Sequence, residues 1–120
     1  MQDYRKLKVW QQSHQLVLRI YKSSRDFPTE EKFGLTSQMR RAAASIPANL
    51  AEGSMRSSDA DFLRFVHIAM GSAAELDYHL LLARDLEFIA PGDYQSLEAE
   101  LSSVRRMLAA LSQKLKSNAR

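Results

Sequence analysis

The chain of 120 residues contains no cysteine, which excludes disulfide bonds, thiolate metal sites and cysteine nucleophiles. Glycine and proline are scarce, at four and three residues respectively. No apolar run approaches the roughly 20 residues that a membrane-spanning helix needs, and the N-terminal segment lacks the apolar stretch of a secretory signal. We therefore expect a cytoplasmic protein with no membrane partner.

Signals for strands, catalysis and metal binding are also missing. No alternating apolar–polar run is bounded by turn residues, and no Gly-x-Ser-x-Gly elbow or glycine-rich phosphate loop occurs. A di-iron bundle needs Glu-x-x-His pairs on two helices, whereas Glu75 and His79 are four residues apart and have no counterpart. We expect no catalytic residue, metal or cofactor, and a protein that is not an enzyme.

The composition that remains is that of a globular protein, 45% hydrophobic and 26% charged. Its length suits one domain over residues 1–120. Apolar periodicity predicts four helices, over residues 8–26, 34–53, 58–88 and 93–116. The last carries a two-in-seven seam of Leu97, Leu101, Val104, Leu108, Leu111 and Leu115. Short connections favour an all-α, antiparallel up-down four-helix bundle.

The most unusual segment is residues 34–56, GLTSQMRRAAASIPANLAEGSMR. Its alanines favour an unbroken helix, whereas Pro47 removes a backbone donor and costs about 3 kcal/mol in a helix interior. The sequence leaves open whether Pro47 kinks one helix or separates two. Gly53 is expected to end this helix as a C-cap. Ser58 is expected to cap the next helix, with Asp61 three residues on.

Charge is distributed unevenly, although the net charge is only +3. The N-terminal region is basic and residues 57–92 are acidic. Lysine and arginine neutralise phosphates without reading base sequence, so this asymmetry fits an anionic partner as well as an ordinary solvated surface. The candidate nucleic-acid-binding residues are Arg5, Lys6, Lys8, Arg19, Lys22, Arg40 and Arg56.

Two stripes outside the expected core indicate self-association. A helix that is apolar on two sides is usually covered on two sides. On the third expected helix the second stripe is Ile68, Gly71, Glu75, Tyr78 and Leu82. On the second expected helix a polar stripe contains Arg41, Ser45, Asn49 and Glu52, with Arg41 and Glu52 expected to pair within or between chains. The alternatives are scattered surface apolar residues and a solvated polar face, both normal on monomers.

The chain resembles the bacterial family of 23S rRNA intervening-sequence proteins, also labelled the S23 ribosomal protein family. The resemblance rests on KVWQQSHQLVLRIY, FPTEEKFGLTSQMRRAAASIPANLAEGSMR and DFLRFVHIAMGSAAELDYHLLLARDL, followed by an amphipathic helix. The positions that match are Arg40, Arg41, Ser45, Pro47, Asn49, Glu52, Gly53, Arg56, Gly71, Ser72 and Glu75. The resemblance implies a four-helix bundle that forms pentameric rings. It also implies a relation to accessory proteins of retroelement reverse transcriptases, which bind nucleic acid and polymerase.

These observations together predict a non-enzymatic accessory protein that acts as a homo-oligomeric ring, with five subunits expected, and binds RNA or DNA. The alternative is a scaffold that recruits a protein partner such as a polymerase and has no direct contact with nucleic acid.

Overall fold

The structure, a computed structural model, describes residues 3–118. Its four α-helices are α1 (Lys8–Ser23), α2 (Leu35–Ser54), α3 (Asp59–Asp85) and α4 (Pro91–Asn118). Short 3-10 helices, η1 (Tyr4–Lys6) and η2 (Thr29–Glu31), precede α1 and α2. Residues 3–118 contain no strand, so the all-α expectation is confirmed.

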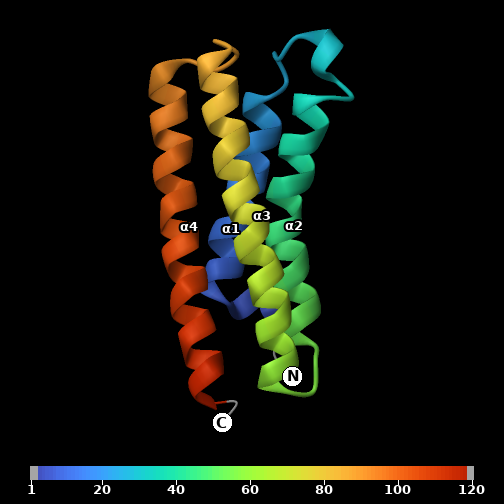
Figure 1. Ribbon diagram of the computed structural model, residues 1–120, viewed down its shortest axis with the longest axis vertical. Helices are drawn as coiled ribbons and strands as arrows, with labels where there is room; N and C mark the ends of the chain where they lie inside the picture. The colour runs from blue at the N-terminus through green and yellow to red at the C-terminus, as the bar shows by residue number, and fades with distance from the viewer. Residues whose placement is uncertain (1–2, 119–120) are drawn as a thin grey trace.

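The helices run alternately up and down as one elongated bundle measuring 47 × 23 × 20 Å (Figure 1). Neighbours in the sequence are neighbours in space, and α1 also packs against α4. The helices therefore form a closed square in which α2 and α3 share the most extensive packing. The connections between the helices are short, as predicted. The α1–α2 and α3–α4 connections lie at one end of the bundle, and the α2–α3 connection lies at the other.

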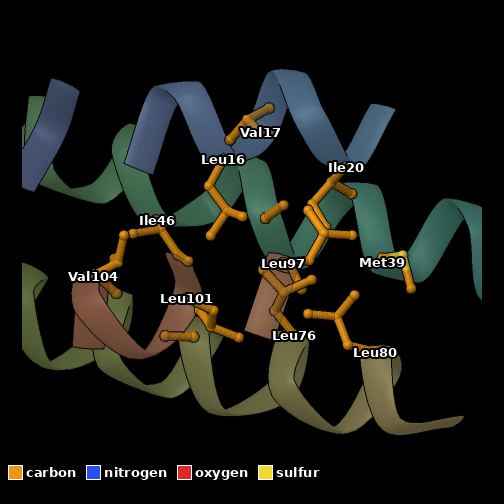
Figure 2. Packing of buried hydrophobic residues seen from close by; sticks show 14 of the residues in the cluster. Leu16, Val17, Ile20, Met39, Ile46, Leu76, Leu80, Leu97, Leu101 and Val104 are labelled. Carbon is orange, nitrogen blue, oxygen red and sulfur yellow. The ribbon is translucent and has the colours of Figure 1, made fainter. Parts of the chain in front are cut away.

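The core runs along the centre of the bundle and draws on every helix (Figure 2). Its largest fully buried side chains include Leu16, Ile20, Met39, Ile46, Leu50, Leu76, Leu80, Leu97, Leu101 and Leu108. Each such side chain stabilises the fold by roughly 1.5–3 kcal/mol relative to an exposed one. Trp10 and Tyr21 continue the apolar arc of α1 in the sequence. Trp10 is only half-buried and Tyr21 is 42% exposed, so the apolar arc is narrower than predicted.

Helix α2 continues through Pro47, which answers the question left open by the sequence. Proline at this position gives no N–H to the carbonyl of Ala43, four residues earlier. Pro47 is itself buried, and Ala43 and Ile46 beside it are almost inaccessible. Tertiary packing along this face of α2 therefore outweighs the local penalty of the proline.

Gly53 does not cap α2, contrary to the sequence interpretation. It lies inside the helix, which ends one residue later, and it has no positive φ angle. A Cβ built on Gly53 would lie 2.7 Å from the Cβ of Phe65 and 2.8 Å from Cδ1 of Phe62. The glycine therefore lets α2 and α3 approach closely at this end of the bundle.

Helix α3 begins as predicted and ends earlier than predicted. The Ser58 hydroxyl accepts a hydrogen bond from the backbone N–H of Asp61 at 3.1 Å, which confirms the cap. At the other end Glu87 has φ 62°, and the N–H groups of Glu87 and Phe88 donate to the carbonyls of Arg84 and Ala83. This is a Schellman motif with glutamate in the left-handed position that glycine usually occupies.

Helix α4 begins at Pro91, two residues before the predicted start. Proline suits the first position of a helix because the N–H that it lacks has no intrahelical partner there. Pro91 therefore starts α4 instead of lying in the break before it.

Candidate functional site

The first group of candidate cations surrounds the start of α1. Arg5 pairs with Asp3 at 3.2 Å, and its guanidinium lies 5.4 Å from the ring centre of Tyr4. Hydrogen bonds from the backbone N–H and side chain of Arg5 lower the pKa of Asp3, which caps η1. Lys6 and Lys8 are exposed and have no ion pair among residues 3–118. These two lysines carry the positive charge that is most accessible here.

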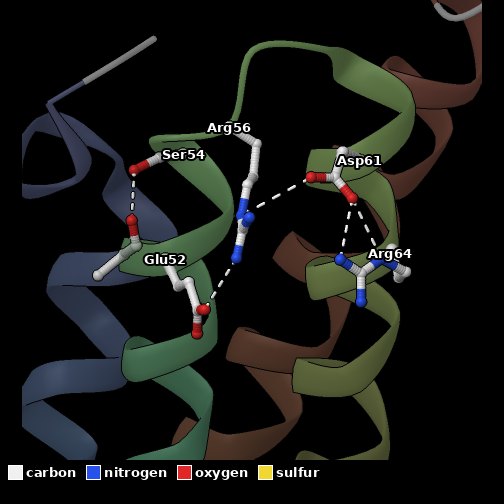
Figure 3. A network of polar contacts seen from close by, with 6 residues as sticks. Glu52, Ser54, Arg56, Asp61 and Arg64 are labelled. Carbon is white, nitrogen blue, oxygen red and sulfur yellow. Dashed lines mark hydrogen bonds and ion pairs between the residues drawn. The ribbon is translucent and has the colours of Figure 1, made fainter.

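Arg56 lies at the same end of the bundle and is held in a network (Figure 3). Its Nη2 donates to Glu52 at 3.0 Å, and its Nε is 3.7 Å from Asp61. Asp61 also accepts from Arg64 at 3.0 Å, and both guanidinium groups lie 4.6 Å from the ring centre of Phe65. Two carboxylates therefore neutralise Arg56, which joins the end of α2 to the start of α3.

The second group lies toward the opposite end, where α1 ends and α2 begins. Arg19 pairs with Glu100 and donates to Ser96 at 2.9 Å, joining α1 to α4. Lys22 is exposed one turn later. The rise of an α-helix places Arg40 about 21 Å from Ser54, where α2 ends, and Arg56 lies just beyond that end, so the predicted set forms two separate groups.

Arg40 is not free, although the sequence favoured it as a candidate for an external anion. Its Nε donates to the Ser24 hydroxyl at 2.8 Å and its Nη2 to the Tyr21 carbonyl at 3.2 Å. Its guanidinium also lies 4.7 Å from the ring centre of Tyr21. A cation at a helix C-terminus meets the negative end of the helix dipole. Arg40 therefore braces the last turn of α1 from α2.

The polar stripe of α2 faces α3 along a shared seam. The hydroxyls of Ser45 and Ser72 are 2.8 Å apart, and the Asn49 amide donates to the Ser45 carbonyl at 2.8 Å. Arg41 is exposed and donates to Gln38, while Glu52 pairs with Arg56. Within the chain, Arg41 and Glu52 therefore have other partners and do not pair with each other, and their pairing between chains stays a prediction.

Beside this seam, the second stripe of α3 is open to solvent. Ile68 is 45% exposed and Tyr78 is 59% exposed, whereas Leu82 packs partly against the core. Gly71 lies between Ile68 and Tyr78, and a Cβ there would meet no atom of residues 3–118 within 4 Å beyond the adjacent backbone of α3. Nothing within residues 3–118 explains a glycine in this helix interior.

His79 lies in the same region, between α3 and α2. Its Nε2 is 3.6 Å from the Glu75 carboxylate, and its Nδ1 is buried with no hydrogen-bond partner within residues 3–118. Desolvation lowers its pKa, nearby Arg41 lowers it further, and Glu75 raises it. The net effect of these groups on the pKa of His79 favours the neutral imidazole.

Two neighbouring residues that sequence reasoning did not select are Lys32 and Phe33, in the connection before α2. Phe33 is 87% exposed, and the Lys32 ammonium lies 5.5 Å from its ring centre. No periodic pattern assigns a face to a residue in such a connection. The signal available was an aromatic residue with a basic neighbour in a polar segment.

Among residues 3–118, no group of three or more His, Asp or Glu side chains is arranged to hold a metal ion. No helix in this part of the chain is both long enough and apolar enough to cross a membrane.

The fold and these surfaces define an all-α four-helix-bundle protein with polar and basic faces at its helix ends. The chain belongs to the family of 23S rRNA-intervening sequence proteins, whose family model matches residues 5–110. It is similar to the crystal structure of a protein with unknown function from the S23 ribosomal protein family of Bacteroides thetaiotaomicron. That comparison has 28% identity and a TM-score of 0.79, and covers 88% of this chain and 98% of the other. No curated protein matched the chain.

Proposed function

We propose that the protein is a non-enzymatic accessory protein that binds nucleic acid, with RNA as its principal target, and acts as a self-associated ring. The observation that carries the nucleic-acid part is that Lys6 and Lys8, beside Arg5, are exposed and have no ion pair in the part of the chain that the structure describes. The family's name, which refers to 23S rRNA, supports RNA as the partner. Cations of this kind bind phosphates by releasing counterions, so the interaction needs no catalytic residue.

A filter-binding titration of labelled RNA at low salt tests this part. The wild-type chain should retain RNA, and affinity should fall linearly with salt on a double-logarithmic plot. Charge reversal at Lys6 and Lys8 should weaken binding, whereas the same reversal at Lys114, an exposed α4 lysine, should have less effect. Failure of the wild-type chain to retain RNA or DNA at low salt would refute the proposal.

The ring is supported by the open face of α3. Ile68 and Tyr78 expose apolar surface on both sides of Gly71, which allows close approach by another helix. The seam around Ser45 and Asn49 adds neighbouring hydrogen-bonding groups. A ring would repeat the basic group once per subunit and so increase affinity for a long polymer by avidity. We propose five subunits, as the resemblance implies.

Placing a charge at Ile68 tests the face directly. Ile68→Asp should dissociate the assembly, because a carboxylate would have to be desolvated in an apolar contact. Circular dichroism should show unchanged helicity, because Ile68 is outside the core. Leu18→Asp, at a 50% exposed position of α1, is the matched control and should leave the assembly intact. Sedimentation of the wild-type chain as a monomer would rule out the ring.

The second candidate function is a scaffold that recruits a protein such as a polymerase. The exposed Ile68 and Tyr78 favour it, because an apolar face can dock an unlike partner as well as a copy of itself. A partner recovered from the native host by pull-down, and resistant to nuclease, would support this alternative. Loss of that partner on nuclease treatment would contradict it.

A further inference from the structure

Two grooves adjoin at the end of the bundle where α1 ends and α2 begins. The larger has a volume of about 510 Å³ and includes Tyr21, Phe33 and Arg41 in its lining. The smaller, of about 200 Å³, includes Arg25. Lys32, Thr36 and Arg40 line both grooves. We call this region the α1–α2 end surface.

The charge of this surface has one sign. Its cationic side chains are Arg25, Lys32, Arg40 and Arg41, and none of the residues described by the structure that line the two grooves is acidic. Two other grooves of the bundle differ in this respect, since one includes Asp77 and Glu98 and the other Asp26 and Asp93. The α1–α2 end surface is therefore an anion-attracting region, because cations that line a concave surface reinforce one another.

The polar groups of the first turn of α2 add to this field. Thr36 and Ser37 belong to that turn, whose backbone N–H groups lie beyond the reach of intrahelical acceptors. The Glu31 carboxylate accepts from the N–H of Leu35 at 3.1 Å but is not in either groove lining. The Thr36 residue is 7% exposed, and its hydroxyl oxygen is buried with no hydrogen-bond partner among residues 3–118. Buried hydroxyls are usually paired, so the Thr36 hydroxyl is an unusual polar group beneath this wall.

Aromatic rings stand beside the cations. Phe33 is 87% exposed and Tyr21 is 42% exposed, and each ring has a cation near it, Lys32 and Arg40 respectively. Arg40 is fixed by its hydrogen bonds to α1, so this part of the surface is preorganised. Proteins that bind single-stranded nucleic acid combine a positive groove for the backbone with aromatic side chains on which bases stack.

We infer that the α1–α2 end surface binds single-stranded nucleic acid, with a phosphate beside Lys32 and the start of α2 and a base stacked on Phe33. The inference rests on the proposed nucleic-acid function and assigns it a site away from Lys6 and Lys8. Duplexes bind more weakly there, because their bases are already stacked and cannot lie on the ring. The site reads no sequence, since every base offers a stacking face.

Fluorescence anisotropy with a labelled oligouridylate of about ten nucleotides tests the site on the full-length chain. Phe33→Ala should weaken binding about tenfold, which is the usual effect of removing one stacking platform. Phe33→Trp should retain binding, because it keeps a ring. Lys32→Ala should weaken binding and reduce the slope of log affinity against log salt by about one, the amount expected for one phosphate contact.

Matched controls separate the site from general effects. Leu18→Ala removes an exposed apolar side chain from α1, and Lys114→Ala removes an exposed cation from α4. Both should bind the oligonucleotide as the wild type does. Thermal unfolding should show that all variants remain folded, since Phe33 and Lys32 are outside the core.

Three results would overturn the inference. Unchanged binding by both Phe33→Ala and Lys32→Ala would remove the site and leave the proposed function intact. Absence of binding by the wild-type chain would end both. Weaker binding by Phe33→Ala together with a smaller sedimentation coefficient would show that Phe33 is covered by another copy of the chain instead of a base.

Discussion

Gly53 of α2 and Phe65 of α3 lie so close that a Cβ at position 53 would stand 2.7 Å from the Cβ of Phe65. Atoms of real side chains do not approach that closely, so this contact requires glycine. The ring of the same Phe65 packs against the guanidinium groups of Arg56 and Arg64. The close helix approach thus positions the arginine network at the α2–α3 turn.

Gly53→Ala should lower the free energy of unfolding by about 1–3 kcal/mol, the usual range for overpacking. The gain in helix propensity from glycine to alanine, about 1 kcal/mol, offsets only part of this loss. Urea denaturation measures the difference. An alanine variant as stable as the wild type would show that α2 and α3 separate at little cost.

Gly71→Ala is expected to act in the opposite direction on the single chain. Beyond the adjacent backbone of α3, no atom of residues 3–118 lies within 4 Å of the new Cβ, so alanine should raise the free energy of unfolding by roughly 0.5–1 kcal/mol at high dilution. In the proposed ring, the added methyl group should weaken subunit contact. Sedimentation over a range of concentrations should show a larger dissociation constant, whereas an unchanged constant would place Gly71 outside the interface.

Glu87→Gly should stabilise the protein by about 1 kcal/mol. Glu87 has φ 62°, a left-handed conformation that is unfavourable for residues with a Cβ and that glycine adopts freely. Glu87→Ala is the matched control, because it removes the carboxylate and keeps the strain. If alanine and glycine raise the thermal unfolding midpoint equally, the charge and not the backbone is responsible.

His79 should make stability depend on pH. Its pKa in the folded state is lowered from the ordinary value of 6.5, so the unfolded chain binds a proton more readily. Stability from this group is therefore complete above pH 6.5 and is lost as pH falls toward the folded-state pKa. Between about pH 7.5 and about pH 5.5, the wild type should lose more stability than His79→Gln. Parallel curves for the two proteins would contradict this.

Much of the fold could be predicted from the sequence because its signals are local. The apolar stripe of α4 identified Leu97, Leu101 and Val104 as core residues, and all three are buried. Ser58 was recognisable as an N-cap because a hydroxyl precedes an amphipathic run. Helix ends and the roles of glycines were harder to predict. A glutamate such as Glu87 does not indicate a left-handed backbone conformation in the way that glycine does. Gly53 resembles a cap until the position of Phe65 is known.

The candidate site was predictable only in part, because accessibility depends on contacts between helices. Arginine side chains commonly bind anions, which made Arg40 and Arg56 candidates. In the structure Arg40 donates hydrogen bonds to α1, and Arg56 is paired with two carboxylates. Phe33, by contrast, is exposed but was not selected from the sequence, because it lies in the connection before α2, where no helical periodicity assigns a face. Binding by any of these residues stays a prediction.

The central claim is that a ring of these bundles binds RNA, and sedimentation velocity with a labelled oligoribonucleotide at low salt tests it most directly. Our account predicts a boundary that sediments faster than a single 13.6 kDa chain. The RNA label should sediment with that boundary and dissociate from it as the salt concentration is raised. A boundary of single chains with the label remaining free would contradict the account.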